Sequence, residues 1–326
     1  MQRAAAAVIV IDDTDVSLHD THPLPESPNR TLMISEAITD HFPDIRRITE
    51  IDELDEQDEC LLAVHAQAYV RHVLKQCESG DEEIISDNRD VRVCGQESKT
   101  AIFKAAAAGV EAVRLIMSGE ATAVFCNVRP PGHHAKHGRG AGYCIFNNMA
   151  IAVTSLFAHY PKEEHRVAIV DWDVHCGDGT YDWLNDPHNE ISSSVIFINT
   201  QQHFKWTYPH GRGKPNFEGG GNRRNLYSYN YACGFGDHED VQQVWTEHII
   251  PLLQQYQPTM IFISCGFDAH EYDLKTSELN FTNETYAWMT TQLKLICPRI
   301  VSILEGGYND LALYEASTAH IRALLE

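Results

Sequence analysis

VAIVDWDVH, at residues 167–175, is an apolar strand-like run that passes directly into two aspartates and a histidine. In extended backbone, residues two positions apart lie on the same face, so Asp171, Asp173 and His175 are expected to point the same way. A solvated acidic loop is the alternative interpretation, but such a face has no use in packing. Because buried carboxylates without a cation are costly, the stretch predicts a metal site at the end of a strand.

Three further polar clusters follow apolar runs of the same kind. They are RPPGHH (129–134) after 123–125, GFD (266–268) after 260–263, and EGGY (305–308) after 300–304. In an open α/β sheet, binding sites form beyond the carboxyl ends of the strands. The four clusters are therefore expected to meet at one place.

Three residues from these clusters form a candidate ligand set. Asp173, His175 and Asp268 supply two carboxylates and an imidazole and leave a fourth position open, which is typical of catalytic rather than structural zinc. The oxygen-rich set also suits iron(II) or manganese. An open position lets the ion acidify water and polarise a carbonyl group. The set therefore predicts a hydrolytic metal site.

The tandem histidines, His133 and His134, follow a rigid Pro-Pro-Gly segment, and two spare carboxylates, Asp171 and Asp178, are available to pair with them. A carboxylate orients a histidine ring and sets its proton affinity. Two such pairs would supply a base for water and an acid for a leaving amine. Tyr308, after two glycines, would donate to an oxyanion. Taken singly, a surface histidine pair and a turn tyrosine explain these residues as well.

The remaining chain predicts an α/β fold with a mostly parallel sheet covered by helices on both faces, because strand-like runs alternate with helical patterns. Helices are expected over 98–117, 148–160, 241–256 and 282–295. Thr282 is the expected N-cap of the last helix. Residues 200–231 are rich in Gly, Pro and Asn and are expected to form a long functional loop.

Composition narrows the class of protein. The formal net charge is −21, which argues against a general nucleic-acid binder and suits a cationic partner such as a lysine-rich protein tail; solubility alone explains it equally well. Nine cysteines occur without a CxxC pair, which indicates a reduced, intracellular protein. The sequence shows no signal peptide and no apolar segment long enough to span a membrane.

As a set, the motifs resemble the histone deacetylase family, closest to its class II members and their bacterial relatives. The matching segments are VRPPGHHA (128–135), GYCIFNNMAIA (142–152), VAIVDWDVHCGDGT (167–180), SCGFDAH (264–270) and ILEGGYN (303–309). The resemblance implies a three-layer α/β/α arginase–deacetylase fold. It also implies that residues 1–326 form a single zinc-dependent catalytic domain, and the helix-like end of the chain fits a domain cut from a longer protein.

The resemblance implies a role for each candidate residue. The implied catalytic residues are His133, His134, Asp171, Asp178 and Tyr308, and the implied zinc ligands are Asp173, His175 and Asp268. His134 matches the proton-transferring residue, and His133 matches a residue that tunes the electrostatics. Tyr308 matches the tyrosine that polarises the amide carbonyl.

A substrate channel and a second cation are implied in the same way. The implied channel residues are Gly142, Tyr143, Tyr208 and Gly306, with Arg30 near the foot of the pocket. The family also holds monovalent cations beside the zinc. The implied K⁺ or Na⁺ site comprises Asp171, Asp173, His175 and Asn199.

Several positions depart from the family's pattern. Tyr143 and Tyr208 stand where two phenylalanines usually wall the channel, so their hydroxyls make the wall more polar. Cys176 replaces a second histidine after the metal-binding histidine. Asn199 stands where the family has a Ser-Leu-His run, and residues 273–276 replace an Asp-Pro-Leu-Gly stretch at the rim.

Together the residues and the resemblance predict a hydrolase that removes acetyl groups from N-ε-acetyl-lysine in proteins, with histone tails as possible substrates. The resemblance also implies a chromatin regulator, and the protein is expected in the cytoplasm, the nucleus or both. The alternative with the same fold is an acetylpolyamine amidohydrolase, which Tyr143 and the acidic surface favour slightly. A catalytically weak scaffold or acyl-lysine-binding module is a third hypothesis, and Tyr308 argues against it. An arginase-like two-metal enzyme is not expected, because the carboxylate repeats for a second metal are missing.

Overall fold

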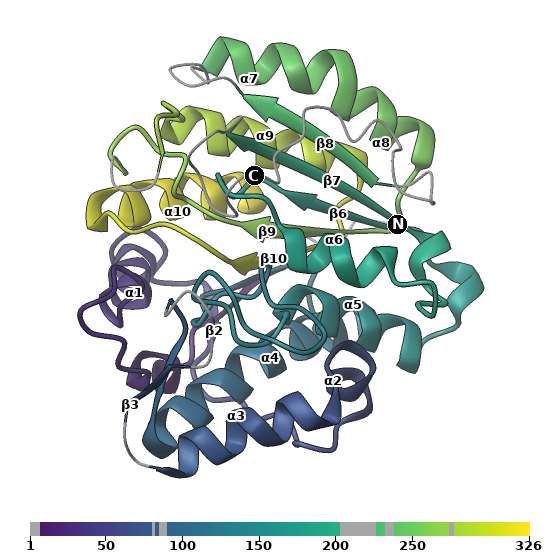
Figure 1. The fold of residues 1–326 in the computed structure, drawn as a ribbon. Helices are drawn as coiled ribbons and strands as arrows, with labels where there is room; N and C mark the ends of the chain where they lie inside the picture. Colours follow the sequence, from purple (N-terminus) through teal and green to yellow (C-terminus); the bar gives the residue numbers. More distant parts are fainter. Residues whose placement is uncertain (1–6, 80–81, 85–89, 203–225, 232–237, 274–276) are drawn as a thin grey trace.

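The computed structural model describes residues 7–79, 82–84, 90–202, 226–231, 238–273 and 277–326. Its centre is an eight-stranded sheet in which every neighbouring pair is parallel (Figure 1). The strands, in spatial order, are β2 (Arg46–Ile48), β1 (Val8–Ile11), β5 (Ala123–Cys126), β10 (Ile300–Leu304), β9 (Met260–Cys265), β6 (Val167–Asp171), β7 (Val195–Gln202) and β8 (Leu226–Tyr231). The short strands β3 (Glu82–Ile84) and β4 (Arg92–Cys94) form a separate antiparallel pair.

Helices cover both faces of this sheet. One face packs against α1 (Asn29–His41), α7 (His238–Val244), α8 (Ile250–Tyr256), α9 (Asn283–Ile296) and α10 (Asp310–Leu325). The other face packs against α4 (Gly95–Met117), α5 (Asn148–His159) and α6 (Asp178–Asn185), and α2 (Glu59–Val64) and α3 (Gln67–Ser79) pack outside α4 and α5. Short 3₁₀ turns occupy Thr14–Leu18, Lys162–Glu164 and Ser192–Ser194. The predicted three-layer α/β/α architecture is confirmed.

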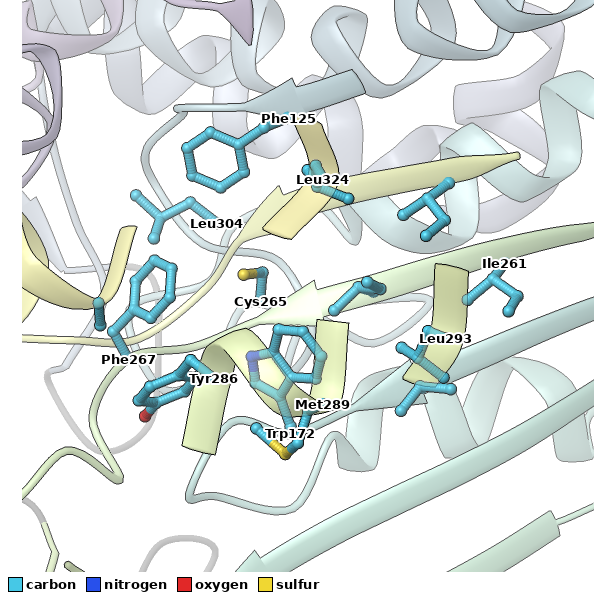
Figure 2. Packing of buried hydrophobic residues seen from close by; sticks show 14 of the residues in the cluster. Phe125, Trp172, Ile261, Cys265, Phe267, Tyr286, Met289, Leu293, Leu304 and Leu324 are labelled. Atoms are coloured by element: carbon cyan, nitrogen blue, oxygen red, sulfur yellow. The ribbon is translucent and has the colours of Figure 1, made fainter. Parts of the chain in front are cut away.

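The alternation of apolar residues in β6 explains how the metal-site segment is oriented. Ala168 and Val170 belong to the core on the α9 side, whereas Ile169 belongs to the core on the α4 side. Trp172, after the strand, belongs to the same core on the α9 side and packs beside Tyr286 and Met289 of α9, as Figure 2 shows. Because successive side chains point to opposite faces, anchoring the indole in this core directs the flanking aspartates away from it.

Most predicted helices are confirmed, with small shifts at their ends. α4, α5 and α9 occupy the expected segments, and the Thr282 side chain accepts a hydrogen bond from the backbone N–H of Thr285 as an N-cap. The helix predicted over 241–256 is confirmed as helical throughout and begins earlier, at His238, but it is not regular along its whole length. A π-helical turn at Trp245–Ile249 separates α7 from α8, directly before Pro251, which has no backbone N–H to continue a regular ladder.

The long loop predicted over 200–231 is wrong at both ends. β7 continues to Gln202, and β8 begins at Leu226 and pairs with it. Gln201 and Gln202 at the end of β7, and Ser228 and Asn230 in the edge strand β8, obscure the strand pattern, because the buried strands of a parallel sheet are recognised by continuous apolar runs. Residues 203–225, with the predicted channel residue Tyr208, lie outside the described residues. Within the described part of the chain, no helix has the length and hydropathy to cross a membrane.

A buried ion-pair network ties the N-terminal segment to the ends of β5 and β10. Glu26 accepts hydrogen bonds from Arg129 at 2.9 and 2.8 Å and from Arg30 at 3.0 Å. Arg30 in turn donates to the carbonyl oxygens of Gly307 and Glu305. All three charged side chains of the network are almost fully buried. The carboxylate of Glu26 therefore holds together the segments that lead into two of the four polar clusters.

We predict that Glu26→Gln lowers the free energy of unfolding by roughly 3–5 kcal/mol at pH 7, because it leaves two guanidinium groups buried without their carboxylate. Burial favours the neutral carboxyl, but Arg129 and Arg30 outweigh it and lower the pKa of Glu26 from 4.5 to about 2. A depressed folded-state pKa means that this stabilisation is complete above about pH 4.5 and is lost as pH falls towards 2.

Urea unfolding of both proteins between pH 7 and pH 3 measures this difference. Glu36→Gln, at an exposed position of α1, is the control and should change the free energy of unfolding by no more than ~0.5 kcal/mol. Equal destabilisation by Glu26→Gln at every pH would contradict the electrostatic explanation.

Candidate active site

The order of the central strands explains why the four polar clusters meet. β5, β10, β9 and β6 are consecutive neighbours in the sheet, and all are parallel, so their carboxyl ends lie along one edge. The RPPGHH, EGGY, GFD and DWDVH segments follow these strands in that spatial order. The expected convergence at the edge of the sheet is therefore present in the fold.

Asp173, His175 and Asp268 form a compact cluster in which one ligand atom of each residue lies within 4.8 Å of the others. Nδ1 of His175 lies 3.0 Å from Oδ1 of Asp173 and 3.0 Å from Oδ2 of Asp268. Both carboxylates are fully buried. The predicted ligand set is thus brought together with its oxygen and nitrogen atoms facing one another.

Backbone donors fix these carboxylates. The N–H of Gly306 donates to Oδ2 of Asp173 at 2.7 Å, and the N–H of Val174 donates to Oδ1 of Asp268 at 2.9 Å. The His175 N–H donates to Oδ1 of Asp173 at 2.9 Å. Each donor comes from a segment that immediately follows β10 or β6, so the ends of the strands themselves set the orientation of the ligands.

The chemistry of this cluster fits a divalent cation. Oδ2 of Asp268 is buried and accepts no hydrogen bond of acceptable geometry, although Nδ1 of His175 is only 3.0 Å away. Burial and the neighbouring carboxylate of Asp173 raise the pKa of Asp268 to about 6. A buried carboxylate in this position is costly unless a cation compensates it, and two carboxylates with one imidazole match zinc's preferred donors.

The tandem histidines each pair with one of the expected carboxylates. Nδ1 of His133 lies 3.1 Å from Oδ2 of Asp171, and Nδ1 of His134 lies 2.9 Å from Oδ1 of Asp178. The two imidazole ring centroids are 4.0 Å apart, and both rings are buried. The pairing expected from the sequence is therefore present. In each histidine, Nδ1 faces the carboxylate, and Nε2 is the other ring nitrogen.

The surroundings drive the proton affinities of the two histidines apart. Burial and the adjacent His133 lower the pKa of His134 to about 4. Burial also opposes protonation of His133, but Asp173 and Asp171 outweigh it and raise its pKa well above the ordinary value; a cation bound to Asp173 would reduce that rise. His134 is thus suited to accept a proton at neutral pH, while His133 is suited to carry charge.

Tyr308 is buried and follows the Gly306-Gly307 pair, whose first glycine donates to Asp173. Its ring centroid is 5.7 Å from that of Tyr143, and the guanidinium carbon of Arg30 lies 4.9 Å from its ring centroid. Asp273 accepts a hydrogen bond from the backbone N–H of Tyr308. Burial raises the pKa of the Tyr308 phenol well above its usual range, so the hydroxyl stays protonated and remains a donor.

Of the predicted channel residues, Gly142, Tyr143 and Gly306 are described, and they lie near Tyr308. Gly142 has φ 53° and Tyr143 has φ 66°, so both occupy the left-handed region, which is unusual for a tyrosine. The Gly142 N–H donates to Oδ2 of Asp90 at 3.0 Å. The half-buried Tyr143 is therefore held in a specific backbone conformation beside the phenol of Tyr308.

Sequence reasoning gave no role to Glu305, which joins two clusters. Oε2 of this fully buried residue accepts hydrogen bonds from the N–H groups of Gly132 at 2.7 Å and His133 at 3.0 Å. Asp90 was missed as well. Glu305 could have been identified from the sequence, because it is an acid that directly follows the apolar strand β10. No local signal marks Asp90, because its contact with Gly142 spans 52 residues.

Asn199, a predicted monovalent-cation residue, lies beside Asp171 in the register of β6 and β7. Its Oδ1 accepts a hydrogen bond from the N–H of Gly177 at 2.8 Å. Among the described residues, two groups with metal-ligand spacing lie at this edge, Asp173 with His175 and Asp268, and His133 with Cys144 and Glu305, and neither group includes Asn199 or Asp171. The monovalent site therefore stays a prediction.

We predict that Gly306→Ala impairs metal binding. A methyl group at this position would overlap the Oδ2 atoms of both Asp268 and Asp173, so we expect zinc affinity to fall about 10- to 100-fold, as for other changes beside a ligand. Zinc content after dialysis against graded chelator, measured by inductively coupled plasma mass spectrometry, gives the affinity. Gly138→Ala is the matched control, since a methyl group there meets no atom within 4 Å. Equal zinc retention by both variants would contradict the site.

The chain is similar to known proteins over almost its whole length. A family profile described as the histone deacetylase domain matches residues 24–324. Histone deacetylase 6 of Caenorhabditis elegans is 32% identical over 327 residues, which cover 94% of this chain and 32% of that protein. A protein named "Probable deacetylase" from Archaeoglobus fulgidus is 35% identical over 271 residues, which cover 81% of this chain and 70% of that protein.

A solved structure, the crystal structure of the HDA15 HD domain, matches with a TM-score of 0.86 and 28% identity and covers 99% of this chain and 89% of that one. The match confirms the predicted arginase–deacetylase fold. This chain spans less than half the length of the first curated relatives it matches. The match of the family profile across most of the sequence leads to one conclusion: the chain belongs to the histone deacetylase family.

Proposed function

We propose that residues 1–326 form one zinc-dependent deacetylase domain that hydrolyses N-ε-acetyl-lysine in proteins. The main support for the proposal is that three groups of side chains lie at one edge of the sheet. A buried Asp-His-Asp cluster, two His–Asp pairs and a protonated tyrosine lie together there. Hydrolysis of an amide needs a polarised carbonyl, a base for water and an acid for the amine, and this set supplies each of them.

Asp173, His175 and Asp268 would hold the zinc ion. When bound, Zn²⁺ would acidify a water molecule and polarise the amide carbonyl. The buried, partly uncompensated Oδ2 of Asp268 supports a cation at this point. One histidine and two carboxylates supply three protein ligands, so a four-coordinate zinc ion would keep one position for water or substrate, as catalytic zinc sites do.

His134 would carry the proton during the reaction. With Nδ1 donating to Asp178, the ring presents Nε2 as the atom that takes a proton from the attacking water and later delivers it to the lysine amine as the amide C–N bond breaks. Burial and the adjacent His133 lower the pKa of His134, so the ring is neutral at physiological pH and Nε2 can accept a proton. His133, paired with Asp171, would set the charge of the site without transferring the proton.

Tyr308 would stabilise the negative charge that develops on the carbonyl oxygen. Its phenol keeps its proton because burial raises its pKa well above the ordinary value, so the O–H is available as a donor. Donors of this kind, preorganised in a site without bulk water, contribute substantially to the rate of acyl transfer. The half-buried Tyr143 beside it would form one wall of the acyl-lysine channel.

The charge of the chain supports a cationic substrate. A net charge of −21 would attract lysine-rich segments such as histone tails by long-range electrostatics. The seven cysteines whose side chains are described are all free thiols, which supports an intracellular protein in the cytoplasm or nucleus. We also propose that a K⁺ or Na⁺ ion binds beside the zinc, at Asp171, Asp173, His175 and Asn199. Burial raises the pKa of Asp171 to about 6, so a nearby cation would stabilise its ionised form.

We predict that Tyr308→Phe lowers kcat by about 10²- to 10³-fold on an acetyl-lysine peptide, since it removes one oxyanion donor. We expect His134→Ala to lower kcat by about 10²- to 10⁴-fold through loss of the acid–base group. Steady-state deacetylation assays with added zinc measure both changes, and thermal unfolding checks that each variant is folded. Full activity in both variants would overturn the assigned roles.

A substrate panel separates lysine deacetylation from the polyamine alternative. We expect kcat/KM for an acetyl-lysine peptide to exceed that for acetylspermidine, and longer acyl-lysine peptides in the same panel define the acyl preference. Higher kcat/KM for acetylspermidine would replace the proposal with the acetylpolyamine amidohydrolase.

A further inference from the structure

A lysine lies behind the carboxylate that orients His134. Nζ of Lys136 is 2.8 Å from Oδ2 of Asp178, while Oδ1 of the same carboxylate contacts Nδ1 of His134 at 2.9 Å. The side chains of Lys136 and Asp178 are only 10% and 9% exposed. The two oxygens of Asp178 are thus occupied from opposite ends by a cation and by the catalytic imidazole.

The position of Lys136 is fixed by several contacts. Its backbone N–H donates to the carbonyl oxygen of Arg139 at 2.9 Å, and its carbonyl oxygen lies 3.0 Å from Nδ1 of the buried His65. Its ammonium group also pairs with Asp182, which lies one turn after Asp178 on α6. The lysine is therefore held against the helix that carries Asp178.

This arrangement acts on the carboxylate in two ways. Held at both oxygens, the carboxylate cannot rotate about its terminal bond without losing one contact, so its orientation towards Nδ1 of His134 is restricted. Burial favours the neutral acid, but the contacts from His134 and Lys136 together lower the pKa of Asp178 to about 2. A permanently ionised, correctly oriented partner keeps the Nδ1 proton on the imidazole.

We propose that Lys136 is a positioning residue for deacetylation, which acts on His134 only through the carboxylate of Asp178. The inference rests on the proposed function, because it assumes that His134 transfers the proton. Neither the substrate nor the metal cluster needs to contact the lysine. Its loss should therefore affect the chemical step and leave substrate binding and zinc binding unchanged.

The test compares variants of the zinc-loaded protein on an acetyl-lysine peptide. We expect Lys136→Met to lower kcat about 10- to 100-fold, the usual cost of losing a partner of this kind, with unchanged KM and zinc content. Lys136→Arg should restore most of kcat because it keeps the cation. Lys162→Met is the matched control: it removes an ammonium group that donates to the Glu190 carbonyl oxygen and contacts neither Asp178 nor His134, so it should leave kcat unchanged.

A double-variant cycle gives the sharpest readout. If Lys136 acts only through Asp178, adding Lys136→Met to Asp178→Asn lowers kcat no further. A further drop equal to that of the single variant, or full kcat in Lys136→Met, would overturn the inference. Should Lys136→Met unfold early on heating, Lys136→Gln, which keeps a donor without the charge, is judged by the same criteria.

The outcomes also separate this inference from the proposed function. Loss of activity in Asp178→Asn and His134→Ala with full activity in Lys136→Met overturns the inference alone. Full activity in Asp178→Asn and His134→Ala overturns the acid–base assignment itself, and the role of Lys136 with it.

Discussion

Burial of like charges is the constraint on which the site depends. Asp171, Asp173 and Asp268 lie side by side at the edge of the sheet, and none of the three is exposed to solvent. Carboxylates in such surroundings are costly unless cations and donors compensate them. Histidine rings, backbone N–H groups and glycines without side chains surround these acids, and the position between Asp173 and Asp268 is the one that a divalent ion would fill.

The parallel sheet makes this concentration of charge possible. Four neighbouring strands deliver their polar ends to one edge, and apolar packing such as that of Trp172 on α9 (Figure 2) fixes the direction of each end. Two buried carboxylates then join the ends to one another: Glu305 links the EGGY segment to the tandem histidines, and Glu26 links Arg30 to Arg129. The geometry of the site is thus set largely by contacts between segments far apart in sequence, such as Glu305 with Gly132, which are 173 residues apart, and Glu26 with Arg129, which are 103 apart.

The sequence predicted the elements whose signal is local. Apolar strands that end in acids or histidines identified Asp173, His175 and Asp268, and helical spacing identified α4 and α9. Features that depend on tertiary contacts were missed. The edge strand β8 carries too little apolar pattern to be seen, and the π-helical turn before Pro251 interrupts a regular spacing. Lys136 shows nothing unusual in sequence, because its importance comes from its distance to Asp178 and not from its neighbours in the chain.

Anomalous X-ray diffraction at the zinc absorption edge, from crystals of the zinc-loaded protein, tests the central claim most directly. We expect one strong peak per chain, located between Oδ2 of Asp268, the carboxylate of Asp173 and Nδ1 of His175. A second group, His133, Cys144 and Glu305, also has ligand atoms within 4.8 Å of one another. A peak at that group instead, or no peak at the Asp-His-Asp cluster, would contradict the account.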